Sequence, residues 1–466
     1  MNTTADTLLS RKAVVLLLCA TVLPIIALVL IQYLGLMSAA VMGAAGLIAL
    51  AGALLVLTHP KIGVYFMLLY VYGGLGFYLP HIAPVGVVGV MAVGVLLALM
   101  RGASFRAMDG VFLCFVTLFA LIALQSMLWA HNLDNSVFAF SILAKSVLLV
   151  VLIVQLIETP EDLRSFGTWI FLGGIAAVVL GMMNLSLGIA GEINVLRRGD
   201  VMRFTGTHAN PNYAAAWMMA AIPMGFFYMK HGRNALVKLA GIAGVLILIA
   251  GVFSTLSRAA VISFAAVVLG VLVKEVKSPK IGAVMVLLLG VGLLLTPGYY
   301  WVRIMAVADL SQSVRSDWSF YLRYSAMRAA WDTFLEHPLT GVGLNNFRVR
   351  SASEVFVRIG PHNGYLEILA DLGLFGFLTY MGVQYSALRQ FAAGFRTRWQ
   401  KGYEWLGDFS YYLILTMVSA LVSVLFMDSE YNYLMWIPVA GGLSLANIRK
   451  RYSKSSAEPN ETTNED

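Results

Sequence analysis

The sequence predicts an all-α polytopic membrane protein with about 12–14 transmembrane helices. Of its 466 residues, 59% are hydrophobic and only 12% are charged. Apolar runs of about 17–25 residues recur from one end of the chain to the other, and an α-helix needs this length to cross a bilayer. The chain therefore has the composition of a helical bundle inside a membrane.

Apolar segments that qualify as helices are spread over the whole chain, about fourteen in all. The first follows a short polar stretch, lacks the small-residue site at which a signal peptide is cut, and is expected to be retained. Several early segments are short or rich in glycine, so the predicted count is a range. In order, the segments begin near Ala13, Met37, Lys61, Ala83, Asp109, Ser136, Ser165, Pro211, Ala235, Arg258, Lys280, His362, Gly407 and Tyr431.

Basic residues set the expected orientation, because loops rich in lysine and arginine stay on the cytoplasmic side. Threading the segments through a bilayer places such loops on one face, together with both chain termini. The two cysteines, Cys19 and Cys114, lie inside apolar segments and are expected to pack in the core. The basic loops lie at residues 101–106, 158–164, 230–238, 274–280, 389–401 and 449–454.

The same threading divides the chain into consecutive parts. N-terminal helices at 1–189 precede a transmembrane region at 190–297, which includes the first outer loop. A large arginine-rich outer loop at 298–361 leads to C-terminal helices at 362–450. The tail at 451–466 is polar, ends in acidic residues and is expected to be a disordered cytoplasmic segment.

Arginine is the basic residue of the two long outer segments, 190–210 and 298–361, whereas lysines fall on the opposite face or inside helices. A guanidinium keeps its proton and binds phosphate through paired hydrogen bonds. The outer surface is therefore predicted to bind an anionic substrate. The alternative is that about half of these arginines contact lipid headgroups or pair with nearby carboxylates. The arginines are Arg197, Arg198, Arg203, Arg303, Arg315, Arg323, Arg328, Arg348, Arg350 and Arg358.

Residues 318–335 are predicted to form an amphipathic helix at the membrane interface. Arg328 has Asp332 one turn later on the same face and is expected to pair with it. Arg323 has no carboxylate at the neighbouring helical positions and is the better candidate for a substrate phosphate. Arg315 and Arg328 are alternatives for the same role. The predicted apolar stripe consists of Phe320, Tyr324, Met327, Trp331, Phe334 and Leu335.

Further candidate ligands lie in three polar segments near the outer face. Arg203 and Asn212 flank the start of a helix, where polar groups suit an anion, although capping is the simpler role for the asparagine. Arg258 lies at an outer hairpin, where an arginine either reaches the interface or contacts a phosphate. His337 opens a loop with two glycines, a pattern that more often marks a turn than a phosphate cradle.

His362 is the candidate catalytic residue. It follows Pro361 and precedes a long apolar helix, so the imidazole lies near the first helical turn at a membrane surface. The positive end of the helix dipole disfavours a second ring proton, which leaves a neutral imidazole able to accept a proton. The competing interpretation is an interfacial or helix-capping histidine. Asn363, the next residue, is a candidate for orienting an acceptor.

Acidic residues give weaker signals. Asp428 and Glu430 resemble part of a metal site, but two carboxylates in a short loop are more often solvated surface, and no metal site is predicted. Glu367 and Asp371 follow His362 along its helix and either orient a group or pack. Lys145 lies inside an apolar segment, where burial would mark a functional charge.

The order of these motifs resembles that of the O-antigen ligase and polymerase superfamily, over roughly residues 200–390. The resemblance implies a GT-C-like helical fold and transfer of glycan from undecaprenyl pyrophosphate at the periplasmic face of the bacterial inner membrane. The ligase branch is the nearest match, and its acceptor is the lipid A-core of lipopolysaccharide. The motifs are Arg203-x-x-Gly206 with Asn210-Pro211-Asn212, Ser257-Arg258, His337-Pro338-Leu339-x-Gly341-x-Gly343, and His362-Asn363-x-x-Leu366 with Gly373 and Gly376.

By the same resemblance, Arg203, Arg258 and Arg323 hold the donor diphosphate and His362 is essential, with no metal or other cofactor. A polymerase of this superfamily and a protein O-oligosaccharyltransferase share these motifs. A transporter of lipid-linked glycan is a third alternative, although such proteins usually show internal repeats and charges at mid-membrane. No nucleic-acid partner is expected.

Overall fold

A computed structural model describes residues 39–79, 82–187, 195–198, 201–208, 210–276, 318–354, 359–428 and 433–453, with single residues at 282, 290 and 298. The predicted segments near Ala13 and Lys280, and the tail beyond residue 453, lie outside these residues. By length and composition, 6 of the described helices are able to cross a membrane. The predicted total of about 12–14 is not tested by the described residues alone.

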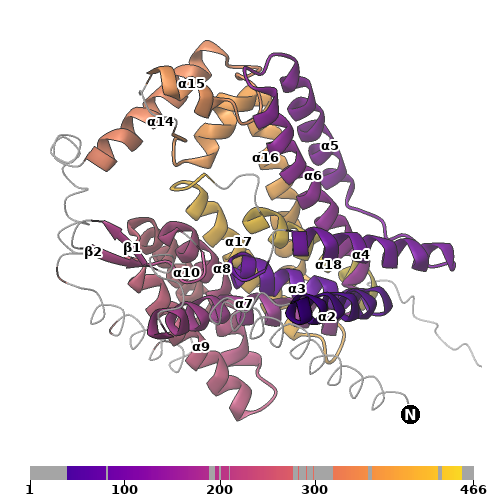
Figure 1. The fold of residues 1–466 in the computed structure, drawn as a ribbon. Helices are drawn as coiled ribbons and strands as arrows, with labels where there is room; N and C mark the ends of the chain where they lie inside the picture. Colours follow the sequence, from indigo (N-terminus) through magenta and orange to yellow (C-terminus); the bar gives the residue numbers. More distant parts are fainter. Residues whose placement is uncertain are drawn as a thin grey trace, which may run out of the picture.

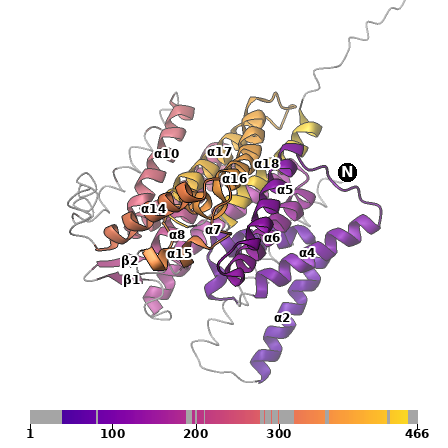
Figure 2. The same ribbon diagram turned by 90° about the horizontal axis from the view of Figure 1, so that it is seen from above.

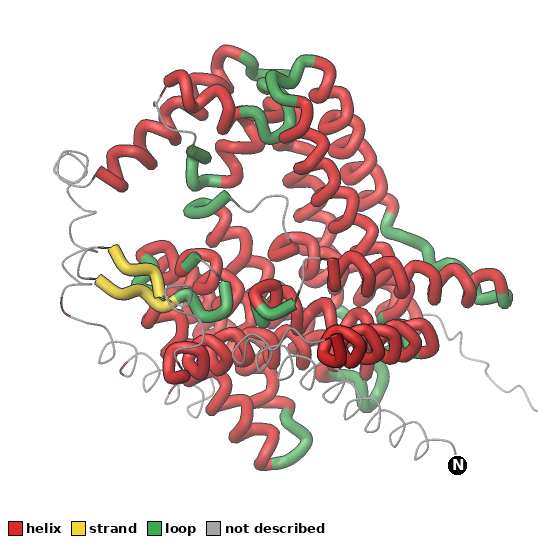
Figure 3. The backbone as a smooth tube through the Cα atoms, in the orientation of Figure 1, coloured by secondary structure: helices red, strands yellow, loops and turns green. Residues whose placement is uncertain are grey.

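The described chain is helical apart from one short hairpin (Figures 1 and 3). Its first half contains α2 (Ala39–Thr58), α3 (Pro60–Tyr72), α4 (Ile82–Met100), α5 (Gly110–Gln125), α6 (Leu133–Leu156), α7 (Pro160–Leu187), α8 (Pro211–His231), α9 (Ala235–Ser254) and α10 (Arg258–Glu275). Its second half contains α14 (Trp318–Glu336), α15 (Phe347–Glu354), α16 (Gly364–Arg396), α17 (Trp405–Val424) and α18 (Tyr433–Tyr452). The antiparallel hairpin joins β1 (Val195–Arg198) to β2 (Val201–Phe204), in a segment that we expected to be loop.

Helix starts follow from local sequence. Asp109, Asn132, Asn210, Asn234 and Asn363 each precede a helix and accept hydrogen bonds from its first free backbone N–H groups. Three helices, α3, α7 and α8, begin at a proline, which loses no hydrogen bond there. The predicted starts at Asp109, Pro211, Ala235 and Arg258 agree with the observed ones within about one residue.

The centre of the bundle is formed by α8, α16, α17 and α18, whose side chains are largely buried. α8 packs against α9 and α17, and α16 packs against α5, α17 and α18 (Figure 2). Small residues allow these close approaches, since a Cβ added to Gly225 would lie 2.3 Å from Val245 Cγ2 and one added to Gly244 2.3 Å from Phe171 Cζ.

Apolar side chains also cover the outside of the bundle. Leu121 on α5 is 55% exposed and Phe138 on α6 is 63% exposed, as expected for helices that face lipid. The structure is therefore an all-α polytopic membrane protein, as the composition predicts. One expectation was wrong: Cys114 on α5 is exposed on the surface of the bundle and does not pack in the core. Lys145 on α6 is partly exposed.

A break in α16 shapes the end of the molecule that carries α14 and α15. Gly373 has φ 66° and ψ −169°, which interrupts the helix and frees backbone groups for another segment. The loop after α14 uses them: the Leu374 N–H donates to the Pro338 carbonyl at 2.8 Å, and the Gly343 N–H donates to the Asp371 carbonyl at 2.9 Å. The loop that begins at His337 is thereby clamped against α16.

The carboxylate of Asp371 completes this clamp. It accepts hydrogen bonds from the backbone N–H groups of Asn345 at 2.8 Å, Asn346 at 3.0 Å and Phe347 at 2.8 Å. These are the N–H groups that a phosphate would need in a glycine-rich cradle. The glycine loop is therefore a structural turn that starts α15, which is the simpler of its two interpretations.

α14 lies over one end of the bundle and packs on α16 (Figures 1 and 2). Its buried face consists of small residues, among them Ala326 and Ala330, which are both 0% exposed. The predicted aromatic stripe faces the other way, with Tyr324 49% and Trp331 47% exposed. This stripe is available to a membrane interface, as expected for an amphipathic helix.

Candidate functional site

His362 lies in a tight turn directly before α16. Its backbone has φ 50°, a left-handed conformation that is uncommon for residues other than glycine or asparagine. The turn aims the imidazole across to the loop after α17, where Nδ1 lies 3.5 Å from Oδ2 of Asp428. This is slightly longer than a hydrogen bond, and such contacts in free enzymes often shorten when substrate binds. The geometry leaves Nε2 as the ring nitrogen that faces away from Asp428.

Backbone hydrogen bonds fix the position of Asp428, and its side chain is buried. The Tyr213 hydroxyl donates to its carbonyl oxygen, and the Gly364 N–H donates to the carbonyl of the preceding Met427 at 3.1 Å. The Asp428 side chain is only 6% exposed. The expectation that this acidic loop is solvated surface was therefore wrong for Asp428, while residues 429–432, including Glu430, lie outside the described residues.

Arg348 on α15 bridges Asp428 to a second buried carboxylate. Its Nε donates to Oε1 of Glu367 at 2.7 Å, and its Nη2 lies 3.2 Å from Oδ2 of Asp428. Glu367 is one turn into α16 and its side chain is 0% exposed. Three segments of the chain thus meet beside His362. We refer to His362, Asp428, Arg348 and Glu367 as the His362 cluster.

The charges of this cluster set its proton affinities. Burial, with the positive charges of Arg323 and Arg348, lowers the pKa of His362 to about 4, so the imidazole is neutral at pH 7. Burial and the negative charge of Glu367 raise the pKa of Asp428 to about 7, against the opposing effect of Arg348. A neutral imidazole was the sequence-based expectation. Its cause is burial and two arginines, whereas we had attributed it to the helix dipole.

A second polar group connects β2 to the start of α8 and the end of α9. Arg203 is 7% exposed, and its guanidinium donates to the Thr255 carbonyl at 2.9 Å and to Oδ1 of Asn212 at 3.1 Å. Asn212 and Ser257 line a cavity of about 10 Å³ together with Met427, the neighbour of Asp428. Asn212, the partner of Arg203, is therefore close to the loop after α17 that carries Asp428. Arg258, the first residue of α10, follows Ser257 and is partly buried.

The arginines of α14 divide as the sequence predicts. Arg323 is partly buried, and its charge acts on both His362 and Asp428, which places it at the cluster. The side chain of Arg328 is 73% exposed and lies 3.9 Å from Asp332 within the same helix. Arg315 lies outside the described residues. Arg323 is thus brought to the candidate site and Arg328 is directed away from it.

The two remaining candidates for orienting an acceptor, Asn363 and His337, have different surroundings. The Asn363 side chain accepts hydrogen bonds from the backbone N–H groups of Tyr365 and Leu366, both at 3.1 Å, and so caps α16. His337 is exposed, with Nε2 3.3 Å from Nη1 of Arg350. In the part of the chain that the structure describes, no group of three or more His, Cys, Asp or Glu side chains has the arrangement of a metal site.

Gly360 supplies a test of the packing around this cluster. A Cβ at Gly360 would lie 2.5 Å from Oδ2 of Asp428 and 3.2 Å from Cζ of Arg348. We expect Gly360→Ala to destabilise the fold by about 1–3 kcal/mol, because the added methyl group must displace charged atoms that are already paired. Thermal unfolding in one detergent, against Gly89→Ala as control, measures this. A Cβ at Gly89 meets nothing within 4 Å, so equal unfolding temperatures for the two variants would contradict the packing.

Comparison with known proteins confirms the resemblance that the motifs predict. Residues 243–381 match the O-antigen ligase family. The chain is also 25% identical over 374 residues to the teichuronic acid biosynthesis protein TuaE of Bacillus subtilis (strain 168), a match that covers 74% of this chain and 73% of that protein. The matches support an enzyme of the O-antigen ligase and polymerase type, with lipid-linked polysaccharide substrates. Arg258, Arg323 and His362 lie inside the family match, whereas Arg203 and Asp428 lie outside it.

Proposed function

We propose that this protein is an O-antigen ligase of the bacterial inner membrane, which moves O-antigen polysaccharide from undecaprenyl diphosphate to a sugar hydroxyl of lipid A-core. The family match over residues 243–381 supports the reaction class. The observation that carries the proposal is the placement of a neutral imidazole beside a buried carboxylate, with Arg323 close by. The active site faces the periplasm and both termini face the cytoplasm, in line with the distribution of lysine in the sequence.

In the proposed reaction, Nε2 of His362 accepts the proton of the acceptor hydroxyl as its oxygen attacks the anomeric carbon. The bond from that carbon to the diphosphate oxygen breaks, and the electron pair leaves with undecaprenyl diphosphate. Attack from the face opposite the leaving group inverts the anomeric centre. Asp428 holds the Nδ1 proton and stabilises the imidazolium that forms, as a carboxylate does in a catalytic triad.

Arginine supplies the positive charge that the leaving diphosphate needs. Arg203, Arg258 and Arg323 are the proposed ligands, because each lies at the outer end of the bundle around the loop after α17. Arg348 is already paired with Glu367 and Asp428, so its role is to position Asp428. Such preorganised cations act on charge that develops in the transition state. Independence from a metal is part of the proposal, and a chelator tests it.

The acceptor distinguishes this proposal from its alternatives. The relative in Bacillus subtilis is named for teichuronic acid, a different polysaccharide, which favours a polymerase as the second candidate. Purified protein is incubated with undecaprenyl-diphosphate-linked glycan and lipid A-core in the presence of a chelator. A glycan-bearing acceptor supports the ligase. Lengthening of the lipid-linked glycan without acceptor product supports the polymerase. If neither product forms, the transferase proposal fails and transport becomes the better account.

The pKa of Asp428 predicts how the transfer rate depends on pH. When Asp428 is protonated it donates to Nδ1 of His362, which puts the ring proton on Nε2 and blocks the base. We therefore expect kcat/KM to fall as the pH drops below about 7, the value to which burial and Glu367 raise the pKa of Asp428. In Asp428→Asn the amide donates at every pH, so the rate should be about 10²–10⁴ lower without that inflection.

The same shift has a predictable effect on stability, which provides the control. A carboxyl whose pKa is raised by folding stabilises the fold fully only below its unfolded pKa, and this contribution is lost as the pH rises through about 7. The wild-type unfolding temperature should therefore decrease as the pH rises from about 4 to about 7, and Asp428→Asn should show a smaller decrease over the same range. An Asn variant that keeps the wild-type rate and pH profile would remove Asp428 from the mechanism.

A further inference from the structure

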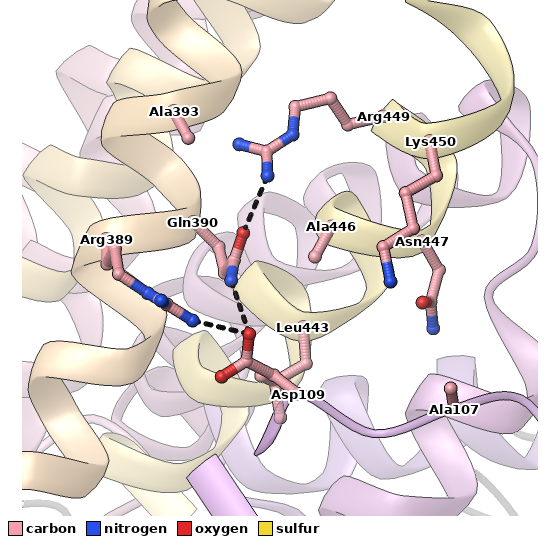
Figure 4. A pocket seen from close by; sticks show the side chains of 10 residues that line it. All are labelled: Ala107, Asp109, Arg389, Gln390, Ala393, Leu443, Ala446, Asn447, Arg449 and Lys450. Atoms are coloured by element: carbon pink, nitrogen blue, oxygen red, sulfur yellow. Dashed lines mark hydrogen bonds and ion pairs between the residues drawn. The ribbon is translucent and has the colours of Figure 1, made fainter. Parts of the chain in front are cut away.

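A cavity of about 390 Å³ lies between the C-terminal parts of α16 and α18, and Figure 4 shows the side chains that line it. It is lined by the start of α5, the C-terminal part of α16 and the last turns of α18, and it is open to the surface. Arg389, on its α16 wall, is roughly 22 Å along the helix beyond the break at Gly373, so the cavity is separate from the His362 cluster. Its volume is typical of pockets that bind small ligands. Its polar lining residues are Asp109, Arg389, Gln390, Asn447, Arg449 and Lys450.

Asp109 is the single acidic residue that lines the cavity, and both of its carboxylate oxygens accept hydrogen bonds. Oδ1 of Asp109 accepts from the backbone N–H groups of Val111 at 3.0 Å and Phe112 at 3.1 Å, where it caps α5. Its Oδ2 accepts from Arg389 Nη2 and from Gln390 Nε2, both at 2.6 Å. Asp109 therefore balances one of the three cations that line the cavity.

The two remaining cations come from α18. Arg449 Nη2 donates to Oε1 of Gln390 at 3.2 Å, which holds the guanidinium over the cavity. Lys450 extends into the cavity from the next position (Figure 4). Within the described residues, neither Arg449 nor Lys450 forms an ion pair with a carboxylate. The cavity thus carries a net positive charge that the described chain leaves unbalanced.

Unused donors on the lining point to the same class of ligand. The Arg389 Nε and the Asn447 Nδ2 are buried and have no hydrogen-bond partner among the described residues. Buried donors are normally satisfied, and leaving one without an acceptor costs free energy. An oxyanion with several acceptor oxygens would satisfy both donors and balance the excess charge.

The surroundings of the cavity fit the headgroup layer of a membrane. Tyr403 and Tyr452 are both partly exposed near the end of α18, and their ring centroids are 4.9 Å apart. Tryptophan and tyrosine at helix ends mark the membrane interface, and basic pockets between helices on the cytoplasmic side bind lipid phosphates. The distribution of lysine in the sequence predicts that this end of the bundle is cytoplasmic.

We propose that this cavity binds the phosphate group of an anionic phospholipid, held by Arg449, Lys450 and the free donors of Arg389 and Asn447. The site is independent of the proposed transfer reaction. Because α5, α16 and α18 all contribute to it, an occupied cavity ties three helices of the bundle together at the end remote from His362. Bound lipid should therefore raise the stability of the folded protein.

The test is thermal unfolding of the full-length protein in neutral detergent, titrated with phosphatidylglycerol, phosphatidylcholine or inorganic phosphate. We expect a saturable rise in unfolding temperature with phosphatidylglycerol alone. In Arg449→Gln/Lys450→Gln the apparent Kd for phosphatidylglycerol should weaken about tenfold or more. The control Lys401→Gln/Arg451→Gln removes the same charge from exposed residues outside the cavity and should keep the wild-type Kd.

Three results would overturn the proposal. Equal stabilisation by phosphatidylcholine would remove the role of headgroup charge, and equal stabilisation by inorganic phosphate would make the ligand a free anion. Equal weakening in both double variants would indicate attraction by the general surface charge. If the Arg449 and Lys450 variant does not fold, native mass spectrometry of the wild type decides: preferential retention of phosphatidylglycerol over phosphatidylcholine supports the site, and equal retention refutes it.

Discussion

Replacing Arg348 with methionine is expected to destabilise the protein by about 3 kcal/mol and to lower the transfer rate with it. Arg348 contacts two carboxylates, those of Glu367 and Asp428, whose side chains are 0% and 6% exposed. Methionine keeps the length of the side chain but removes the charge, which leaves two buried carboxylates close together. The value is at the lower end for such a change because Arg348 itself is 38% exposed and solvent screens part of its charge.

Arg350 on the same helix is the matched control for this substitution. It pairs with Glu336 at the surface, where the side chain of Glu336 is 55% exposed. Surface ion pairs contribute about 0–1 kcal/mol to stability, so Arg350→Met should have an unfolding temperature close to that of wild type. Adding Glu367→Gln to Arg348→Met should recover part of the lost stability, because it removes one of the unpaired charges. If Arg348→Met and Arg350→Met unfold at the same temperature, the buried network does not stabilise the fold.

Replacing His362 with asparagine is expected to lower the transfer rate by about 10²–10⁴, the usual contribution of a general base. Asparagine is the sharper substitution, because it tolerates the left-handed backbone with φ 50° that alanine would strain. The unfolding temperature of His362→Asn should stay near that of wild type, because the imidazole is only partly buried and its contact with Asp428 is longer than a normal hydrogen bond. The rate loss then reports chemistry and not folding.

His337→Asn is the control that separates the two candidate histidines. His337 is exposed and contacts Arg350, away from the buried carboxylates of Asp428 and Glu367. We expect this variant to keep a rate within about threefold of wild type, as for a surface substitution. A large loss in His337→Asn together with a small one in His362→Asn would exchange the roles that we assign.

Local sequence patterns predicted the parts of the site that depend on neighbours in the chain. The interaction of Arg328 with Asp332 follows from helical spacing, and the start of a helix close to His362 follows from Pro361. The capping role of Asn363 was not predicted. The neutral state of His362 was also predicted, although for a different physical reason. The amphipathic character of α14 was correct, but its buried face proved to be alanine, because the helix packs on α16 while its aromatic face remains exposed.

Contacts between distant segments were not predictable in the same way. Asp428 looked like a surface residue because its burial depends on Arg348 and His362, which lie on other elements. Asp371 and the loop after α14 meet only because Gly373 breaks α16 and exposes its backbone. A signal was present in the sequence: isolated carboxylates beside apolar helices are costly unless they are paired. That signal identifies a residue that needs a partner without identifying the partner.

The most direct test of the account is a single turnover of transfer by His362→Asn and by wild type, each loaded with the same labelled undecaprenyl-diphosphate glycan, with lipid A-core and chelator present. Donor binding is measured on the same samples. The account predicts equal binding of donor, because the arginines are unchanged, together with a rate at least about 100-fold lower in the variant. Transfer by His362→Asn at the wild-type rate would show that the proton is taken elsewhere and would contradict the central role of His362.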